Sequence, residues 1–449
     1  MNTHPPRGMR DFLPDDVRQR QYVMGVVADV YQRYGFEPLE TPAAENIETL
    51  MGKYGEEGDR LIFRILKRGE GAETGQADLA LRYDLTVPLA RVVAEYRARL
   101  PKFFKRFQMQ PVWRADRPQK GRFREFYQCD VDAIGSASML VEAELLAAAA
   151  DVLTRLGFEQ FTIRLNHRKA LNGLLAAAGV ADAQQGEVLV TLDKLDKIGA
   201  DGVRAELGDR GLAGDRTDAL VRLFATSSGD ANDARLARLE EAVAGHAQGL
   251  AGIAELEEIL TLSRGTGAGA RIVIDPSLAR GLSYYTGAIF EVAVPDLAGS
   301  LGGGGRYDNL IGMFLGHEVP ACGISLGLER ILVVMGERGM FPPAVAAAHA
   351  DVMITCWSAA RAPAALALAA ELRAAGLRVD VYPEPDKVGK QFKYAASRKV
   401  RLVVVEGDDE AARGEVAVKD LATGEQTALP RAEAAARMAE LKVALGSGL

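Results

Sequence analysis

The start of the chain carries an amphipathic pattern that predicts a helix. Asp15 and Asp16 can cap this helix, Gly35 is expected to end it, and its apolar side repeats at steps of three and four residues: Tyr22, Val23, Val26, Val27, Val30 and Tyr31. From residue 36 to 132 short runs alternate with turns, and residues 79–83 and 124–131 read as strands. One helix followed by a sheet-rich region is therefore predicted.

The middle of the chain changes from strand-like to helical pattern and back again. Residues 166–269 show helical periodicity broken by Gly and Asp turns, without strong strands. Residues 271–294 and 302–336 return to strand-like, Gly-rich sequence. We expect a helical insertion at 166–269 that interrupts a core formed by residues 1–165 and 270–340.

A separate small domain is predicted after a linker. Residues 341–350 combine two prolines with an Ala-rich run, which is typical of a linker. Beyond it, strands at 351–356, 378–382 and 401–405 alternate with a helix at 359–375, and a last helix is expected at 431–445. Residues 351–449 should form an α/β domain.

Composition narrows the class of protein. A length of 449 residues with 48% hydrophobic and 26% charged residues describes a globular protein of more than one domain. The apolar stretches are far shorter than the roughly 20 residues of a membrane-spanning helix, and the N-terminus lacks a signal pattern, so a cytoplasmic location is expected. The three cysteines and five histidines show no ligand spacing, so neither a disulfide nor a metal site is indicated.

Charge restricts nucleic-acid contacts to local patches. The net charge is −7, which argues against binding of phosphates over the whole surface. Residues 101–125 nevertheless hold eight basic and two acidic side chains, and residues 387–402 hold six basic and no acidic ones.

The first patch contains the most informative segment, WRADRPQKGRFREFYQCDVD at 113–132. Its arginines surround a turn at Gly121 and are followed by aromatic residues, so a strand, loop and strand could wrap an anion and offer a ring to a purine. A solvated basic loop is the alternative interpretation.

Four further segments suggest a pocket. In residues 81–91 a predicted strand would bring Asp84 and Thr86 to a turn before Pro88. Residues 279–291 are predicted to form a strand whose paired tyrosines face opposite sides, so at most one of them would line a pocket. The glycine run at 301–308 permits close ligand approach, although a flexible loop explains it equally well. Residues 323–335 pass from a strand into a helix that begins near Arg330.

In this order the segments resemble histidyl-tRNA synthetases from Arg7 to about Leu441. RGMRDFLP at 7–14 is similar to the family's N-terminal signature, and residues 34–42, 113–132 and 323–331 resemble class II motifs 1, 2 and 3. RGLSYY at 280–285 and GGGRYD at 303–308 resemble the two histidine-specific segments. Residues 389–395 and 414–426 resemble the anticodon-binding domain.

The resemblance implies an α/β (α+β) fold with an antiparallel-sheet class II catalytic core, a helical insertion and a C-terminal α/β anticodon-binding domain. It implies a histidine–tRNA ligase that uses ATP with Mg²⁺ to form histidyl-adenylate and then charges tRNA(His). A homodimer is expected because motif 1 lies at the dimer interface of class II enzymes.

The resemblance also assigns roles by position. It implies catalytic roles for Arg280 and Arg114, with ATP bound by Arg114, Asp116, Phe126 and Arg330. Histidine would be bound by Asp84, Leu85, Thr86, Arg114, Gln128, Asp132, Arg280, Tyr284, Tyr285 and Tyr307. The tRNA would meet Gln119, Lys120, Lys390, Lys393 and Arg398.

The chain departs from the family pattern at a few positions. Ser283 stands where many members have Asp, Asp116 where motif 2 usually has Glu, and Asp84 and Asp132 where many bacterial members have Glu. A different class of function, a regulatory protein that binds histidine or RNA without charging tRNA, is the main alternative. Such paralogues generally lose the Arg-bearing segment or the C-terminal domain, and another class II synthetase conflicts with the two histidine-specific segments.

Overall fold

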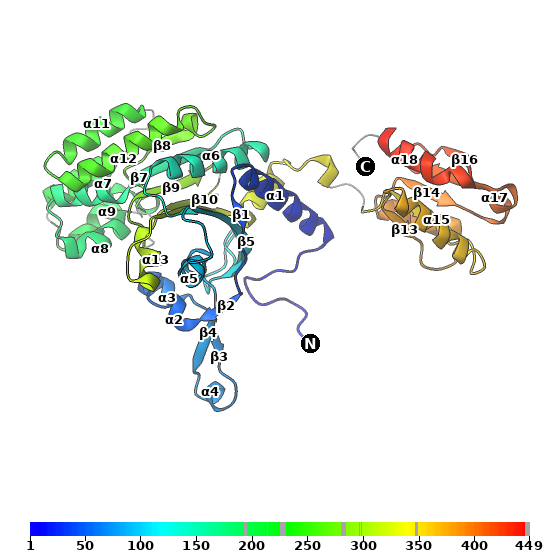
Figure 1. Cartoon of the computed structure of the whole chain (residues 1–449), viewed down its shortest axis with the longest axis horizontal. Coiled ribbons are helices and arrows are strands. Elements are labelled where there is room, and N and C mark those ends of the chain that lie inside the picture. Colours follow the sequence, from blue (N-terminus) through cyan, green and yellow to red (C-terminus); the bar gives the residue numbers. More distant parts are fainter. Residues whose placement is uncertain are drawn as a thin grey trace. The chain divides into compact units, whose positions relative to one another are not determined.

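The computed structural model describes residues 1–192, 195–212, 214–224, 230–279, 284–295, 297, 299–345 and 349–444. They form two compact units, Met1–Met340 and Phe341–Leu449 (Figure 1). Within the described ranges, no helix has the length and apolar content needed to cross a membrane.

The first unit is organised around an eight-stranded, mainly antiparallel sheet. Only the outer pairs β1–β5 and β7–β8 are parallel. Its strands are, in spatial order, β1 (Glu37–Pro38), β5 (Phe104–Trp113), β6 (Glu125–Ile134), β11 (Ala321–Gly327), β10 (Gly302–Arg306), β9 (Ala288–Ala293), β7 (Thr162–His167) and β8 (Ile272–Ile274). Because β11 pairs directly with β6, the strands after the helical region complete the sheet begun before it, as predicted.

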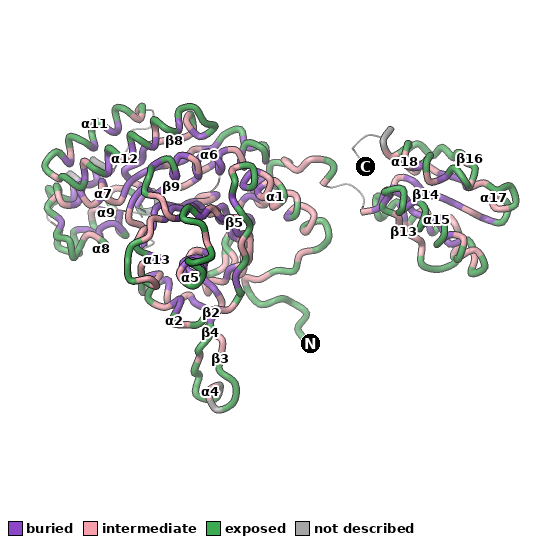
Figure 2. The backbone as a smooth tube through the Cα atoms, in the orientation of Figure 1, coloured by how far each residue is buried: buried purple, intermediate pink, exposed green. Residues whose placement is uncertain are grey.

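Helices cover both faces of this sheet. Helices α1 (Pro14–Arg33), α6 (Leu140–Arg155) and α14 (Leu328–Glu337) pack together on one side. Helices α5 (Thr86–Tyr96) and α13 (Asp308–Leu315) pack on each other in the curve of the sheet (Figure 1). Figure 2 shows the buried residues concentrated along these strands and the helix faces that meet them.

The predicted first helix is present, but its start differs in detail. Its apolar stripe is confirmed, because Val23, Val27 and Val30 are buried. The helix begins at Pro14, before the aspartates, and the backbone N–H of Leu13 donates to Asp16 Oδ2 at 3.1 Å. Asp16 therefore caps from inside the first turn, where a negative charge also suits the helix dipole.

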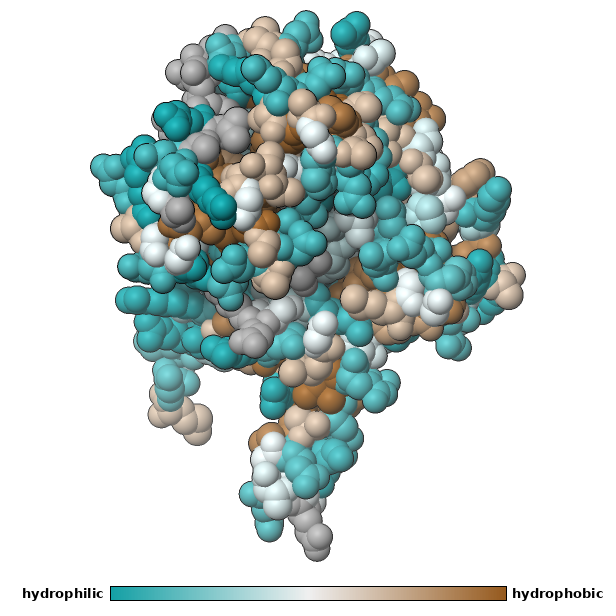
Figure 3. All heavy atoms as spheres, turned by 90° about the vertical axis from the view of Figure 1, so that its left-hand side faces the viewer, coloured by the Kyte–Doolittle hydropathy of each residue, from teal (hydrophilic) through white to brown (hydrophobic). Residues whose placement is uncertain are grey.

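A three-stranded sheet extends from the first unit. It contains β2 (Ala44–Asn46), β4 (Ala77–Leu81) and β3 (Arg64–Leu66) in that order, with the short helices α2 (Ile47–Leu50), α3 (Gly55–Arg60) and α4 (Glu70–Glu73). The strand predicted at 79–83 begins and ends two residues earlier. In Figure 3 the β3–β4 hairpin projects from the rest of the unit, and hydrophobic side chains gather near its base.

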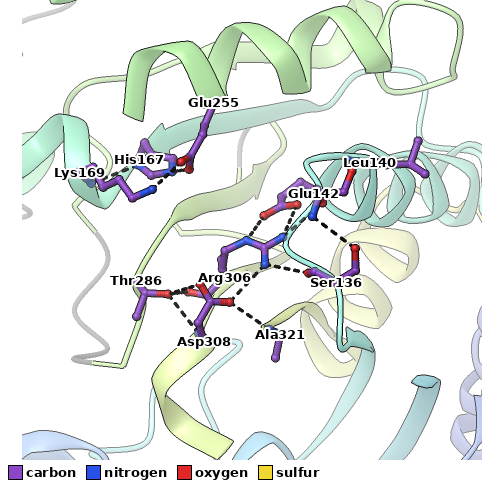
Figure 4. Close-up of polar contacts among 11 residues, drawn as sticks. Ser136, Leu140, Glu142, His167, Lys169, Glu255, Thr286, Arg306, Asp308 and Ala321 are labelled. Atoms are coloured by element: carbon purple, nitrogen blue, oxygen red, sulfur yellow. Dashed lines mark hydrogen bonds and ion pairs between the residues drawn. The ribbon is translucent and has the colours of Figure 1, made fainter. Parts of the chain in front are cut away.

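The helical insertion is present. It consists of α7 (Arg168–Ala177), α8 (Asp182–Leu192), α9 (Leu195–Asp209), α10 (Gly214–Phe224), α11 (Asn232–Ala242) and α12 (Ala247–Ser263), and the 3₁₀ turn η1 (Gly269–Arg271) follows. Asn166 and His167, the first residues of the predicted insertion, instead end strand β7. His167 Nε2 lies 2.7 Å from Glu255 Oε2, while Nδ1 accepts from the N–H of Lys169, which ties β7 and α7 to α12 (Figure 4).

A buried ion pair and the hydrogen bonds around it join strand β10 to α6, α13 and β11. Arg306 at the end of β10 donates from Nε and Nη2 to the two carboxylate oxygens of Glu142 in α6, at 2.6 and 2.8 Å. Its Nη1 also donates to Asp308 Oδ1, and Asp308 accepts from the N–H of Ala321 (Figure 4). Both Arg306 and Glu142 are almost wholly buried and therefore lack solvation by water. The two parallel hydrogen bonds between them compensate for this loss.

The second unit is an α/β domain with its own core. Its sheet contains β13 (Val379–Val381), β12 (Val352–Ile354), β14 (Leu402–Val405), β15 (Glu415–Asp420) and β16 (Gln426–Pro430) in that order. Its helices are α15 (Ala362–Ala374), α16 (Val388–Ser397), α17 (Asp408–Arg413) and α18 (Ala434–Ala444), with 3₁₀ turns η2 (Pro343–Val345) and η3 (Arg431–Glu433). Every predicted element is present, whereas α16, α17, β15 and β16 were not predicted as elements.

Candidate active site

A cavity of about 390 Å³ opens on the sheet of the first unit. Its walls come from β6, β10 and β11, from the start of α5 and from loop 114–124, which joins β5 to β6. Most residues predicted for one pocket from separate segments meet here: Asp84, Thr86, Arg114, Asp116, Phe126, Gln128, Asp132, Tyr284, Tyr285, Tyr307 and Arg330.

Among the described residues predicted to bind histidine or ATP, Leu85 does not line this cavity and is fully buried. Arg280, expected to be the principal catalytic cation, lies outside the described residues, as does Ser283.

One end of the cavity holds buried carboxylates around a single arginine. Arg106 Nη2 lies 2.9 Å from Asp132 Oδ2, and the Tyr307 hydroxyl donates to the other oxygen of Asp132. Burial raises the pKa of Asp132, although Arg106 and the tyrosine oppose the rise. Burial likewise raises the pKa of Asp130 to about 7, with Arg106 opposing and Asp132 adding to the rise. This end can therefore accept N–H groups, and its charge is sensitive to pH near neutrality.

Asp84 stands at the N-terminus of α5 and presents a free acceptor. Its Oδ1 accepts from the Tyr54 hydroxyl and from the N–H of Val87, both at 3.0 Å. Its Oδ2 and the Oε1 of Gln128 are buried, and neither has a hydrogen-bond partner among the described residues. Unpaired buried acceptors are costly, so two of them in one cavity favour a ligand that brings donors, such as an ammonium group. The predicted turn before Pro88 is wrong, because α5 already begins at Thr86.

The tyrosine pair differs from the predicted strand. Tyr284 and Tyr285 precede β9, which begins at Ala288. Their ring centroids lie 4.9 Å apart, and both rings line the cavity, so the expectation that only one would do so is wrong. Alternation between faces does not apply to them, since it requires extended strand geometry. The Tyr284 and Tyr307 ring centroids are 6.1 Å apart, which completes an aromatic wall.

Glycines form the floor of the cavity. The run at 302–305 is the central strand β10, paired on both sides, so the alternative of a flexible loop is wrong. A Cβ on Gly304 would lie 1.9 Å from the carbonyl oxygen of Gly323, and a Cβ on Gly323 would lie 1.9 Å from Asp132 Oδ1. Side chains at these positions would collide with the neighbouring backbone or with Asp132, so the floor is built without them.

The other end of the cavity is basic and aromatic. The predicted arrangement of strand, loop and strand is confirmed by the β5–β6 hairpin. The Arg114 guanidinium carbon lies 4.2 Å from the ring centroid of Tyr83 and 5.1 Å from that of Phe126. Asp116 forms a two-fold hydrogen bond with Arg122 at 3.0 Å, and Arg330 donates to the Ser300 carbonyl. Cations and aromatic rings at this end suit a phosphorylated purine.

The residues proposed to meet RNA are exposed and lie in both units. Gln119 and Lys120 are exposed in loop 114–124, and Lys120 forms an ion pair with Glu337. Lys390 and Lys393 are exposed on α16, and Arg398 directly follows that helix. Separately, the described residues contain no group of three or more His, Cys, Asp or Glu side chains that could hold a metal ion.

Comparison with known proteins decides which family has this architecture. A family profile described as Histidyl-tRNA synthetase matches residues 8–331. The chain belongs to the histidyl-tRNA synthetase family. A second profile, described as Anticodon binding domain, matches residues 351–441, and within the family this accounts for the separate second unit.

Relatives of the family match along nearly the whole chain. The histidine–tRNA ligase of Porphyromonas gingivalis is 45% identical over 442 residues, which cover 95% of this chain and 96% of the relative. That of Flavobacterium johnsoniae is 42% identical over 461 residues, covering 94% and 96%. The solved structure of histidyl-tRNA synthetase from a Nostoc species has a TM-score of 0.81 at 32% identity and covers 98% of this chain and 99% of that one.

Several residues of this histidyl-tRNA synthetase site were not predicted from the sequence. Asp130, Phe123 and Glu329 line the cavity, and Tyr54 and Arg106 contact residues that do. Strand alternation was an available signal for Asp130, since it lies two residues from both Gln128 and Asp132 and so shares their face of β6. No local pattern marks Tyr54, whose place depends on its contact with a residue thirty positions later.

Proposed function

We propose that this chain joins histidine to tRNA in two steps. The carboxylate of histidine attacks the α-phosphorus of ATP, the bond to the β-phosphate oxygen breaks, and pyrophosphate leaves. A hydroxyl of the terminal ribose of tRNA(His) then attacks the carbonyl carbon, and AMP leaves. The observation that carries the proposal is the single cavity with carboxylates and tyrosines at one end and arginines at the other, in a chain of this family.

Histidine would occupy the acidic end of the cavity. The unpartnered oxygens of Asp84 and Gln128 suit its α-ammonium group, with Thr86 beside them and Leu85 supporting the start of α5. Asp132 and Tyr285 would take the two imidazole nitrogens, while Tyr284 and Tyr307 shape the pocket. A pocket that bonds both ring nitrogens rejects apolar isosteres, because they leave buried polar groups unpaired.

ATP would occupy the basic end. Phe126 offers a ring face to adenine, and Arg114 lies between the two ends, where it can hold both the α-phosphate and the histidine carboxylate. Asp116 and Arg330 would contact the nucleotide from the two sides of the cavity. Arg280 is proposed as the principal catalytic cation, because charge accumulates on the phosphate oxygens in the transition state.

Mg²⁺ is proposed to accompany ATP. Magnesium prefers oxygen ligands and commonly binds through one or two carboxylates together with substrate phosphates. The cavity offers Asp116 and Glu329 for this purpose, both of which also pair with arginines. When bound, the ion would neutralise charge on the departing pyrophosphate.

Each part of the chain is proposed to have its own role in catalysis, RNA binding or assembly. We assign the catalytic core to residues 1–165 and 270–340, together with Asn166 and His167 at the end of β7, the rest of 166–269 to the helical insertion, 341–350 to the linker and 351–449 to anticodon binding. Gln119 and Lys120 are proposed to meet the acceptor end of tRNA, and Lys390, Lys393 and Arg398 its anticodon arm. A homodimer in the cytoplasm is the proposed state, because motif 1 mediates dimerisation in class II synthetases.

The first experiment is exchange of labelled pyrophosphate into ATP, with the twenty amino acids supplied singly. Exchange with histidine alone, dependent on Mg²⁺, is the expected result, followed by charging of tRNA(His). Histidine binding without exchange would overturn the proposal and favour a regulatory protein. Arg280→Ala should abolish exchange while the fold, followed by circular dichroism, is retained; an unchanged rate would remove its assigned role.

A further inference from the structure

We propose that the N-terminal segment 8–12 is a brace for the nucleotide end of the cavity, with Arg10 as a positioning residue that acts through Phe123. The proposal rests on the proposed function, since it deepens the role of the same cavity. Phe123 belongs to loop 114–124 and lines the cavity. The guanidinium carbon of Arg10 lies 3.3 Å from the centroid of its ring, which is direct stacking.

The segment is joined to the loop through the backbone as well. The N–H of Arg124 donates to the carbonyl of Gly8 at 2.8 Å, and the N–H of Arg114 donates to the carbonyl of Arg124 at 2.9 Å. The N-terminal segment thus lies beside the returning limb of the loop, next to the residue proposed to hold the α-phosphate. Displacing the segment would loosen the limb that carries Phe123.

Gly8 shows that this contact is closely packed. Its φ is +85°, a conformation that L side chains rarely adopt. A Cβ there would lie 2.8 Å from the Cγ atoms of both Pro118 and Arg124, which belong to the two limbs of the loop. The segment therefore fits against both limbs at once.

The other side of the brace is anchored in rigid elements. Phe12 contacts both Arg10 and Arg20, whose guanidinium carbons lie 4.9 and 4.1 Å from its ring centroid. Arg20 of α1 donates to Glu329 of α14 at 2.9 Å, and Glu329 also accepts from the N–H of Tyr127 at 2.9 Å. Alternating aromatic and guanidinium groups therefore connect Phe123 to two core helices and to strand β6.

The loop is held both by bonds within it and by contacts with the rest of the unit. Within it, Gln119 and Arg122 pair across the tip, Asp116 pairs with Arg122, and Arg124 Nε donates to the Asp116 carbonyl. Outside it, the N–H of Ala115 donates to the Leu61 carbonyl at the outgoing limb and Lys120 forms an ion pair with Glu337 at the tip, whereas Phe123 on the returning limb is stacked on Arg10. Small displacements of groups that position a substrate have large effects on rate, so an external brace has a direct consequence for ATP.

The test compares Arg10→Ala with Arg7→Ala in the full-length chain. Arg7 directly precedes the brace and is exposed, so its variant is the matched control. In Arg10→Ala we expect the KM for ATP in pyrophosphate exchange to rise roughly ten-fold, with the KM for histidine and the melting temperature unchanged. An unchanged KM for ATP would overturn the proposal. A lower melting temperature with equal rises in both KM values would also overturn it and leave Arg10 only a structural role.

Two further variants separate stacking from charge. Arg10→Lys keeps a cation near Glu329, which lies 3.9 Å from Arg10 Nη2, but it loses the planar group that stacks on Phe123. We expect it to resemble Arg10→Ala; full activity in the lysine variant would contradict the stacking. In Phe123→Ala, adding Arg10→Ala should raise the KM for ATP little further, and independent effects would contradict action through Phe123.

Calorimetry of ATP binding tests the brace without relying on ligase activity, so failure of the brace and failure of the proposed function can be told apart. If the wild-type chain showed no exchange with any amino acid, the ligase assignment would fail. A weaker affinity of Arg10→Ala than of Arg7→Ala for ATP would still support the brace, and equal affinities would overturn it.

Discussion

At the scale of single residues, one buried arginine, Arg106, lies close to two buried carboxylates of the site and affects the pKa of both. Arg106 forms an ion pair with Asp132, while Asp130, two residues away on the same strand face, is hydrogen-bonded by the neutral side chains of Gln128 and Ser325. Both carboxylates are nearly inaccessible to water, so burial raises the pKa of each. Arg106 and the Tyr307 hydroxyl oppose the rise for Asp132, whereas Asp130 has a pKa of about 7 and holds a proton that leaves near neutral pH.

The role of Asp132 can be tested by removing its charge. Asp132→Asn should lower kcat/KM for histidine by roughly ten- to one-hundred-fold, because a charge-assisted hydrogen bond contributes about 1.5 to 3 kcal/mol. The KM for ATP should change little. Asp132→Glu, which keeps the carboxylate, should retain most of the activity. Steady-state exchange kinetics provide the measurement, and an unaltered histidine KM in the asparagine variant would contradict the assignment.

Asp130 should make the free energy of unfolding depend on pH. Its pKa is about 7 in the fold, whereas an unfolded aspartate titrates near 4, so the native state holds the extra proton between these values. The stability contributed by this proton is complete below about pH 4 and is lost as pH rises through about 7.

Asp130→Asn removes that titration while keeping the size of the side chain. The melting temperature of Asp130→Asn minus that of wild type should be larger at pH 8 than at pH 5, by roughly 2 °C or more. The reason is that only the wild type loses a stabilising proton between these two pH values. Asp11→Asn, at an exposed position, is the control and should show no such difference. Identical pH profiles for wild type and Asp130→Asn would show that Asp130 does not hold its proton.

At the scale of elements, strand β10 has an unusual composition with a structural reason. Its first four residues are glycines, and its backbone pairs with β9 and β11 while forming the floor of the cavity. Glycine weakens a strand because it supplies no side chain to pack. The last residue, Arg306, compensates by anchoring the strand to α6 through Glu142.

A methyl group is enough to test the packing of this strand. Gly304→Ala would bring Cβ to 1.9 Å from a backbone oxygen, so the neighbouring strands must move apart. We expect a loss of several kcal/mol, seen as a lower melting temperature or loss of soluble protein. Gly336→Ala is the control, because it adds the same group in open space within α14 and should stabilise by about 0.5 to 1 kcal/mol. Equal melting temperatures for the two variants would refute the packing argument.

Several long helices and strands were predictable from sequence, whereas loops and contacts between residues far apart in the chain were not. Helices α1 and α15 and strand β6 carry regular patterns, so their type followed from periodicity. The loop with Tyr284 and Tyr285 looked like the start of β9 because apolar composition is shared by strands and buried loops. The cavity residues were found by resemblance to a family, whereas contacts such as Arg106 with Asp132 depend on sheet register, which local pattern does not show.

At the scale of the whole molecule, the two units have separate hydrophobic cores. The core of the second unit is formed by residues of that unit alone, from Ala350 to Met438. All residues that line the cavity belong to the first unit. Activation chemistry and the proposed reading of the anticodon are thus assigned to different folding units.

This division predicts that the two steps can be separated by truncation. A fragment of residues 1–340 should retain histidine-dependent pyrophosphate exchange within a few-fold of the full chain, because its cavity is complete. Charging of tRNA(His) should fall much further, since affinity for nucleic acid depends on the number of phosphate contacts. Exchange and charging assays on the same preparation test this, and equal losses in both would contradict the division. Sedimentation of the fragment checks that it keeps the oligomeric state of the full chain.

The glycine floor also bears on redesign of amino-acid specificity. A pocket is usually enlarged by shortening a side chain, but the backbone of β10 offers none to shorten. Larger substrates can be admitted only by trimming the walls, above all Tyr284, Tyr285 and Tyr307, and each of these changes removes a contact proposed for histidine itself. Gain of a new substrate is therefore coupled to loss of the old one, and intermediates with broad specificity should be rare in a directed-evolution experiment on this chain.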